Sequence, residues 1–293
     1  MKKKRNPIIA ALLSLVFPGL GQIYNGQLLK AAVFYISSYF LSLIAAPGLF
    51  RTFPGMIIIV VLSIGYYLFM VGDAFVISRK QVDYDLKQCN KWYIYISYAF
   101  VTLIVSNVLA DFIRTEIIKA KSFKIYHSAM APTLEKGDYF IAGLKNDEHR
   151  KGDVVVHYFP GDSNKTFVKR ISAISKDTVL IKDKILFING IKQDEPYVIH
   201  EDSQTIGKTS AFGLQGTEYQ RQWEQAGFAN MFSVRDNFGP VVIPEGYYFM
   251  LGDNRDYSLD SRFIGPVSKE LVKGTARYIY FSKQMSRIGK DIN

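Results

Sequence analysis

Cysteine and histidine are scarce in this chain of 293 residues, which has one cysteine and four histidines. A single thiol, Cys89, excludes a disulfide within the chain and a cysteine-based zinc site. The histidines follow no metal-ligand spacing such as HExxH, so we expect no bound metal and no cofactor. They are His127, His149, His157 and His200.

Charged residues are scarce in the first 113 positions, which hold 10 Lys/Arg and 4 Asp/Glu, whereas residues 114–293 hold 26 and 22. The net charge of +10 therefore divides into +6 and +4. Neither part has the concentrated basic face of a nucleic-acid-binding protein. We expect two domains, one in the membrane and one in water, divided between residues 113 and 114. Two domains also agree with the length of the chain, at roughly 150 residues per domain.

Long apolar runs are confined to the first part. A helix that crosses a bilayer needs about 20 mostly apolar residues. Three segments meet this requirement, namely residues 31–50, 56–77 and 92–113. A fourth apolar segment, residues 8–24, is broken by Pro18, Gly19 and Gly21, and we expect it to be re-entrant or interfacial.

The Lys and Arg clusters predict which side of the membrane each segment faces, because such residues mark the cytoplasmic side. Clusters at residues 2–5 and 79–91 should share that side. Three crossings and a re-entrant segment 8–24 satisfy this condition and place residues 114–293 outside, so we expect a multi-pass protein. A cleavable signal peptide is the competing interpretation of the N-terminus, but no convincing small-x-small site follows Leu20.

Residues 114–293 show short runs of alternating apolar and polar residues, a pattern typical of strands. The clearest runs are residues 153–158, 167–174, 178–181, 185–188 and 247–251. Asn189-Gly190 favours a hairpin, because both residues accept the positive φ of a type I′ turn. Residues 200–240, with Trp223, interrupt the rhythm and are interpreted as an insertion that forms a surface lobe. The predicted fold is transmembrane helices followed by a mainly β domain with this inserted lobe.

Three short segments of the β domain carry reactive or charged side chains: SAMAPTLEKGD at 128–138, FVKR at 167–170 and GDNRDYSLDSR at 252–262. Singly, each is ordinary loop or strand sequence. In this order, and outside a membrane anchor, they resemble the bacterial type I signal peptidases, which are Ser-Lys proteases of family S26. The resemblance covers most of residues 115–282.

The resemblance implies a membrane-bound serine endopeptidase that removes signal peptides from exported preproteins. It places the protein in the bacterial inner (cytoplasmic) membrane, with an extracytoplasmic catalytic domain. Its partners would be the lipid bilayer and secreted preproteins with small residues at the first and third positions before the cut. No nucleic-acid partner is expected.

By the resemblance, Lys169 is the general base. A lysine accepts a proton only when it is neutral, and burial among apolar strands lowers the pKa of the amine. Lys169 lies inside the apolar run 167–171, which is a suitable setting. Its neighbour Arg170 should point to the opposite face of the strand.

The nucleophile position is occupied by alanine. In the family, the serine is followed by Met, one variable residue and Pro-Thr, and counting back three residues from Pro132 gives Ala129. A methyl group cannot attack a carbonyl, and Ser128 would point to the other face of an extended segment. We predict that the chain is inactive as it stands. An engineered inactivation, a naturally inactive homologue and a local shift of register all remain open.

Five further positions match the last motif of the family. Ser258 would orient the lysine amine, and Asp260 and Arg262 would form a charged pair that holds the floor of the site. Gly252 and Asp253 would shape the turn that brings this loop to the lysine. The alternative for Asp260 and Arg262 is a surface ion pair of at most about 1 kcal/mol.

The backbone N–H of Ala129 would survive the substitution and could polarise a scissile carbonyl. The family often adds a serine hydroxyl two residues earlier, where this chain has His127, so the second oxyanion donor stays unassigned. Met130, Phe140 and Ile141 are expected either at the bilayer surface or in the substrate pockets.

Other classes of function were weighed against the protease. A pseudoenzyme that binds signal peptides without cutting them is the main alternative. A small-molecule transporter is disfavoured, because Asp73 and Asp111 are the only acidic residues in the spans and no inverted repeat is apparent. A soluble self-cleaving repressor is disfavoured by the hydrophobic half and by the absence of a DNA-binding segment.

Overall fold

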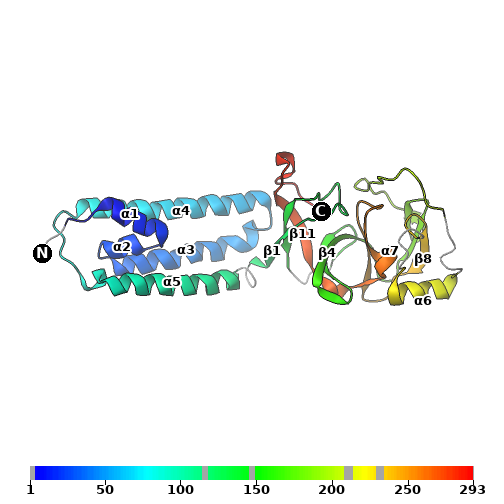
Figure 1. Cartoon of the computed structure of the whole chain (residues 1–293), viewed down its shortest axis with the longest axis horizontal. Helices are drawn as coiled ribbons and strands as arrows, with labels where there is room; N and C mark the ends of the chain where they lie inside the picture. The colour runs from blue at the N-terminus through cyan, green and yellow to red at the C-terminus, as the bar shows by residue number, and fades with distance from the viewer. Residues whose placement is uncertain (1–3, 114–117, 145–148, 208–213, 229–233, 293) are drawn as a thin grey trace. The chain divides into compact units, whose positions relative to one another are not determined.

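Helices form the N-terminal part of the chain and strands the C-terminal part (Figure 1). The computed structural model describes residues 4–113, 118–144, 149–207, 214–228 and 234–292. The chain divides into two compact units, Met1–Lys119 and Ala120–Asn293, here called the helical unit and the β unit. The boundary expected between residues 113 and 114 adjoins residues 114–117, which lie outside the described residues.

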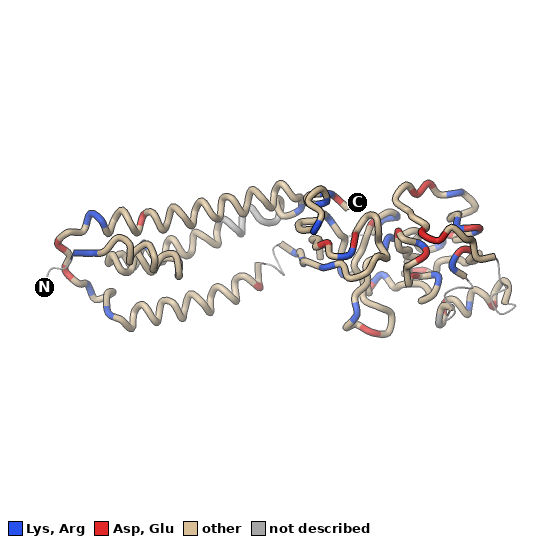
Figure 2. Tube along the Cα trace, turned by 45° about the horizontal axis from the view of Figure 1, so that its top comes forward, with Lys and Arg blue, Asp and Glu red and all other residues tan. Residues whose placement is uncertain are grey.

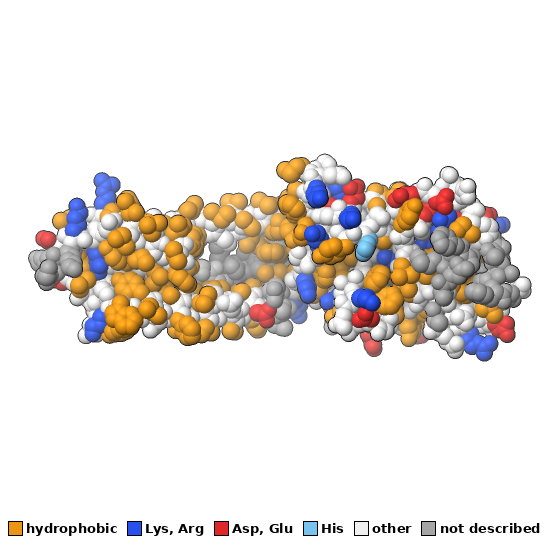
Figure 3. All heavy atoms as spheres, in the orientation of Figure 1, with side chains coloured by type: hydrophobic (Ala, Val, Ile, Leu, Met, Phe, Trp, Pro, Cys, Tyr) orange, Lys and Arg blue, Asp and Glu red, His pale blue; other side chains and the backbone are white. Residues whose placement is uncertain are grey.

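Five α-helices and a 3₁₀ turn are described in the helical unit. They are α1 (Pro7–Val16), α2 (Leu20–Tyr24), α3 (Leu28–Leu49), α4 (Phe53–Lys80), η1 (Gln88–Asn90) and α5 (Trp92–Phe112). Helices α3, α4 and α5 coincide with the three apolar segments expected from the sequence. Helices α4 and α5 are long and apolar enough to cross a membrane, judged by length and composition. Charges are sparse along the helices (Figure 2), and apolar side chains cover their visible face (Figure 3).

Helices α1 and α2 form a short hairpin whose two ends lie at the same end of α4. The Arg5 N–H donates to the carbonyl of Gln81, and the Gln81 side-chain amide donates to the carbonyl of Asn25 at 3.1 Å. Between these ends, the Tyr67 hydroxyl donates to the carbonyl of Leu15 at 2.6 Å. The chain therefore runs along α4 to about the level of Tyr67, turns at residues 17–19, and returns.

Buried polar side chains attach this hairpin to α4. The Gln22 amide donates to the carbonyl of Met70 at 2.8 Å, and the Asn25 amide donates to the carbonyl of Ala74 at 2.7 Å. Asp73, the acidic residue inside an apolar run, pairs with Lys30 at 2.7 Å. These contacts explain why a segment with so many apolar residues also carries Gln22 and Asn25 in its sequence.

The β unit is built on an antiparallel sheet of seven strands in the order β1-β2-β11-β3-β4-β9-β10. Its strands are β1 (Ala120–Lys124), β2 (Tyr139–Gly143), β3 (Val154–Phe159), β4 (Asp162–Ile174), β9 (Tyr247–Leu251), β10 (Val267–Ser268) and β11 (Val272–Phe281). Strand β4 lies in the interior of this sheet, with Val155 of β3 opposite Lys169 and Leu251 of β9 opposite Arg170. Lys169 is thus paired with β3, and the ladder to β9 begins at the next residue, Arg170.

A second antiparallel sheet has the order β7-β6-β5-β8. Its strands are β5 (Thr178–Lys182), β6 (Ile185–Ile188), β7 (Ile191–Lys192) and β8 (Phe238–Val242). Asn189 and Gly190 connect β6 and β7 with φ angles of 53° and 78°, which confirms the hairpin expected from this pair. Short helical elements complete the unit: α6 (Gly216–Ala226), α7 (Ser261–Ile264), η4 (Lys269–Leu271) and η5 (Met285–Arg287).

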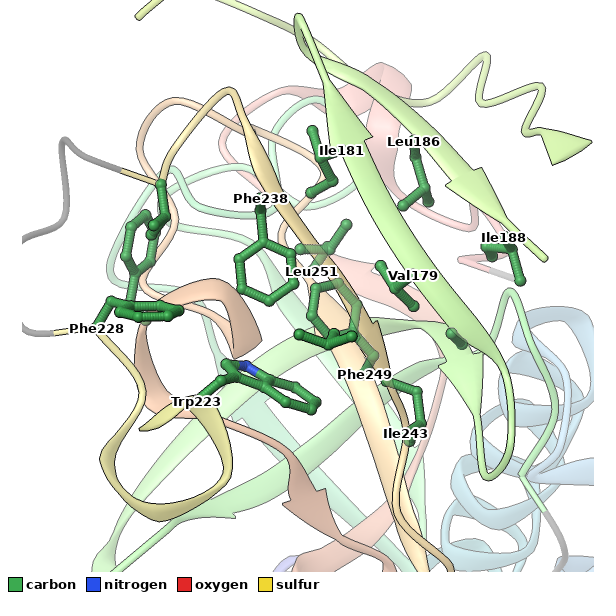
Figure 4. Packing of buried hydrophobic residues seen from close by; sticks show 14 of the residues in the cluster. Val179, Ile181, Leu186, Ile188, Trp223, Phe228, Phe238, Ile243, Phe249 and Leu251 are labelled. Atoms are coloured by element: carbon green, nitrogen blue, oxygen red, sulfur yellow. The ribbon is translucent and has the colours of Figure 1, made fainter. Parts of the chain in front are cut away.

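The segment 200–240 is an insertion between β7 and β8, but its tryptophan does not lie on the surface. Trp223 of α6 is fully buried and packs with Phe228, Phe238 and Phe249 over the second sheet (Figure 4). Its indole N–H donates to the carbonyl of Ser261 at 2.7 Å. Helix α6 lies at the surface with its polar face exposed, while its apolar face closes this core. Residues 208–213 and 229–233 of the insertion lie outside the described residues.

Three apolar residues were expected either at the bilayer surface or in substrate pockets, and all three are buried. Met130, Phe140 and Ile141 are 2%, 0% and 8% exposed. Met130 and Phe140 belong to one apolar cluster of the seven-stranded sheet, and Met130 also lines a cavity of the β unit.

Candidate active site

A cavity of about 710 Å³ brings together residues from all three sequence motifs. Ser128 and Ala129 of the first motif line it, with His127 just before them, together with Lys169 of the second motif and Tyr257 of the third. The loop after β1, strand β4 and the loop after β9 supply these side chains. We call this cavity the groove.

Lys169 is a buried amine, 3% exposed, on the wall of the groove. Its Nζ donates to the carbonyl of Val168 at 3.1 Å. Burial lowers the pKa of Lys169 from 10.5 to about 8; the Asp260 carboxylate opposes this shift and the Arg262 guanidinium adds to it. A substantial fraction of the amine is therefore neutral at mildly alkaline pH.

Arg170, the neighbour of Lys169, lines a different cavity of the β unit, together with Tyr197. Its guanidinium lies 4.0 Å from the centre of the Tyr197 ring. This agrees with the expectation that successive residues of a strand point to opposite faces.

Backbone contacts hold Ala129 against the loop that follows β9. The Ala129 carbonyl accepts a hydrogen bond from the Asn254 N–H at 3.2 Å. A Cβ atom built on Gly252 would collide with the Ala129 carbonyl oxygen and with Oγ of Ser258. Glycine at position 252 thus allows the nucleophile position and Ser258 to meet. Within the described chain, no residue accepts a hydrogen bond from the Ala129 N–H.

Ser128 and His127, which precede Ala129, are both exposed on the groove. The Ser128 carbonyl accepts from the Ala131 N–H at 2.9 Å, which closes a turn before Pro132. The backbone contacts therefore join residue 129, not residue 128, to the Ser258 loop.

Asp260 and Arg262 form a buried pair and not a surface one, with side chains 0% and 1% exposed. Arg262 Nε donates to Asp260 Oδ1 at 2.8 Å, and Nη2 donates to Oδ2 at 2.9 Å. Asp260 Oδ2 also accepts from the Gly252 N–H at 3.1 Å. The guanidinium and the nearby Lys169 ammonium hold the pKa of Asp260 low, against the effect of burial. The alternative of a surface ion pair is wrong.

Ser258 is 1% exposed and lies between Gly252 and Asp260. Its Oγ makes no hydrogen bond of standard geometry, although it is close enough to the Asp260 carboxylate to help lower the pKa of that group. The Ser258 hydroxyl is therefore available to another partner.

Asp253 ties the two motif loops to strand β4. Its carboxylate accepts from Arg170 Nε at 2.9 Å and Nη2 at 2.7 Å, and from the Thr133 hydroxyl at 2.5 Å. The side chains of Arg170 and Asp253 are 7% and 1% exposed. Thr133 was not singled out from the sequence, although its place after Pro132 in the first motif was a usable signal.

A strap of residues 195–202, which the sequence did not indicate, crosses the Asp253 loop. The Ile199 N–H donates to the Asp253 carbonyl at 3.0 Å. Glu195 accepts from Arg255 at 2.6 Å, and Glu201 accepts from the Asn254 amide at 2.5 Å. No local pattern reveals these contacts, because the partners are more than 50 residues apart.

His157 of β3 is a second buried titratable group near Lys169. Its Nδ1 lies 2.7 Å from the Tyr158 carbonyl, and its Nε2 is buried without a partner. Burial lowers its pKa to about 4, and the Lys169 ammonium contributes. His157 is therefore neutral at physiological pH. Among the described residues, no group of three or more His, Cys, Asp or Glu is arranged to hold a metal ion.

Comparison with known proteins identifies relatives over both units. The family model described as "Signal peptidase, peptidase S26" matches residues 95–281. A second model, of a family of unknown function, matches residues 3–46.

Named relatives are signal peptidases. Signal peptidase I of Bacillus licheniformis is 34% identical over 184 residues, which is 61% of this chain and 85% of that protein. Signal peptidase IB of Staphylococcus aureus is 32% identical over 203 residues, which is 67% of this chain and 91% of that protein.

A crystal structure of a signal peptidase I from Enterococcus faecalis is 26% identical and covers 44% of this chain and 97% of its own, with a TM-score of 0.29. At that score the superposition adds nothing to the sequence match. The family match extends over more than half of the chain and includes all three motifs of the groove. The chain therefore belongs to the signal peptidase family, peptidase S26.

Proposed function

We propose that the β unit binds the signal peptides of exported preproteins in the groove, and that it is a Ser-Lys endopeptidase with alanine at the nucleophile position. The observation that carries this proposal is the buried Lys169 amine, with a pKa lowered to about 8, on the wall of a groove that Ala129 also lines. A lysine confined among apolar strands costs stability. A role as the catalytic base would explain why a lysine occupies this buried position.

The chemistry requires a hydroxyl at position 129. With serine there, the neutral Lys169 amine takes the Oγ proton while Oγ attacks the scissile carbonyl carbon. The resulting ammonium gives this proton to the leaving amine, and the acyl group stays on Oγ. Lys169 then deprotonates a water molecule that releases the acyl group. The Ser258 hydroxyl would orient the amine, which fits its burial and its lack of a standard partner.

Oxyanion stabilisation is assigned to the N–H of residue 129, which has no acceptor within the described chain. Such a donor lowers the barrier because it points at the charge that develops on the carbonyl oxygen. His127 lines the groove at the place of the family's second donor and is exposed.

The chain as it stands would bind signal peptides without cleaving them, because the Ala129 methyl group has no lone pair. The peptide would lie extended in the groove, as in strand addition to a sheet edge. Small residues at the first and third positions before the cut would allow its backbone to approach residue 129.

The membrane arrangement proposed here has three crossings, α3, α4 and α5, with the α1–α2 hairpin re-entrant. The 10 residues of α1 rise about 15 Å, half of the thickness of a hydrocarbon core. Both ends of the hairpin lie at the end of α4 that carries Arg79 and Lys80. With those residues cytoplasmic, three crossings put the β unit on the extracytoplasmic side.

The test is restoration of cleavage in the full chain in detergent. We expect Ala129→Ser to cut a preprotein at its signal peptide, and Ala129→Ser with Lys169→Ala to be inactive. Ser128→Ala in the restored protein is the matched control, and it should leave cleavage within a factor of a few. Loss of activity in that control would mean that Ser128 is the nucleophile through a shift of register.

The alternative, a pseudoenzyme, predicts a different result. It requires tight binding of the preprotein with no cleavage after Ala129→Ser, measured by crosslinking and by the mass of the product. Absence of both binding and cleavage would contradict the proposed function altogether.

A further inference from the structure

The groove has a charge of one sign. Among the described residues that line it, four are lysines and none is Asp or Glu. The lysines are Lys124, Lys136, Lys165 and Lys169. Three separate segments supply them: the end of β1, the loop before β2, and strand β4. Chain segments far apart in sequence therefore converge with like charges on one cavity.

Three of these lysines are exposed and form a rim, whereas Lys169 is buried and is assigned to the chemistry. The Lys124 ammonium lies 5.4 Å from the ring centre of Tyr126 and 5.1 Å from that of Tyr139, contacts that leave its charge uncompensated. Within the described chain, no carboxylate lies at ion-pair distance from Lys124 or Lys136.

Lys165 has a weak partner. Its Nζ lies 3.1 Å from Asp162, and the two side chains are 68% and 32% exposed. An exposed ion pair of this kind has a small interaction free energy, and salt screens it further. Asp162 itself does not line the groove. The rim therefore keeps a positive potential.

The rest of the β unit does not share this bias. Residues 120–293 contain 24 Lys/Arg and 21 Asp/Glu, and the two kinds are interspersed along the trace (Figure 2). A cleft with charges of one sign and low-dielectric walls concentrates the field, which selects ligands of the opposite sign.

We propose that the groove selects signal peptides with acidic side chains close to the two small residues before the cut. This inference rests on the proposed function and names its substrate class. An acidic peptide is favoured over an anionic lipid surface, because the lysines line the same cavity as Ala129 and Lys169. The rim would contact residues that flank the peptide segment held beside these two.

The test uses three synthetic signal peptides with the same apolar core and the same Ala-x-Ala segment. They differ only in the residues on either side of that segment, which are Glu, Gln or Lys. Binding to the full chain in zwitterionic detergent is measured by fluorescence anisotropy. We expect the Glu peptide to bind about tenfold more tightly than the Lys peptide at low ionic strength, with the difference shrinking in salt.

Charge reversal at the rim should invert the order. We expect the double variant Lys136→Glu and Lys165→Glu to bind the Lys peptide more tightly than the Glu peptide. Lys192→Glu, an exposed lysine of β7 outside the groove, is the control with the same type of charge change and should keep the original order.

Each other outcome counts against the inference. Equal binding of all three peptides would overturn it and leave the proposed function intact, whereas no binding of any peptide would overturn both. If charge reversal changes only the affinity for phosphatidylglycerol vesicles, the rim serves the lipid surface and acidic peptides are not selected.

Discussion

The Cα atom of Gly252 faces the carbonyl oxygen of Ala129 with no space between them for a methyl group. Ser258 Oγ lies against the same point, where a Cβ atom of residue 252 would stand. One glycine therefore sets how closely the nucleophile position and Ser258 approach each other.

Gly252→Ala should damage catalysis more than folding. In the Ala129→Ser background, we expect kcat/KM for preprotein cleavage to fall about 100-fold, because a displacement on the order of 1 Å misaligns the reacting groups. Gly207→Ala, where an added Cβ would meet no atom within 4 Å, should leave kcat/KM unchanged. Equal activity of the two variants would refute the close approach as a catalytic requirement.

Asp253→Asn should destabilise the β unit by about 3 kcal/mol, because it leaves the buried Arg170 guanidinium without its counter-charge. Trp223 fluorescence in a Trp92→Phe background reports unfolding of this unit, since the chain has two tryptophans. The control is Glu245→Gln, which breaks the exposed pair with Lys176 and should cost less than about 1 kcal/mol. A similarly small loss of unfolding free energy in both variants would contradict the role given to Asp253.

The cleavage rate of Ala129→Ser should depend on pH through Lys169. Only the neutral amine accepts the serine proton, so kcat/KM should rise about tenfold per pH unit below the pKa and level off above about 8. Lys169→Arg should abolish cleavage at every pH, because guanidinium stays protonated. A rate that is flat across this pH range would show that Lys169 is not the base.

Replacing Lys169 by methionine should stabilise the protein. The pKa of the amine is about 8 when folded and near 10.5 when unfolded, so between these values the unfolded state binds the additional proton. Stability of the unmodified chain should therefore rise with pH over that window, by about 3 kcal/mol in all, and the cost of burying the ammonium is fully present below it.

Lys169→Met should remove this pH dependence and raise the unfolding midpoint at neutral pH by on the order of 5 to 10 °C. The exposed Lys192→Met serves as the control, with no change expected. Destabilisation by Lys169→Met would mean that the amine is held by favourable contacts, and the burial argument would be wrong.

The sequence pattern predicted strands and a turn whose formation depends on neighbouring residues alone. The apolar runs 185–188 and 247–251 coincide with β6 and β9, because a strand with one buried face alternates with a period of two. Lys169 was expected inside an apolar strand, and it lies in β4, opposite Val155 of β3. The Asn189-Gly190 turn follows from the backbone preference of these two residues.

Contacts between distant segments could not be predicted. The burial of Trp223 depends on Phe238 and Phe249, which come from strands that the sequence does not pair. The strap of residues 195–202 is likewise held by the loop at Asp253 to Asp256, more than 50 positions later. Polar residues in such a stretch look like a solvated lobe until their partners are known.

The α1–α2 hairpin has a consequence for the order of folding during synthesis. Its buried amides, Gln22 and Asn25, donate to carbonyls of Met70 and Ala74, which lie 48 and 49 positions later in the chain. A chain made from its N-terminus has no partner for these amides until α4 has been synthesised. Gln22 and Asn25 therefore reach these contacts only after α4 has been made, although they are translated well before it.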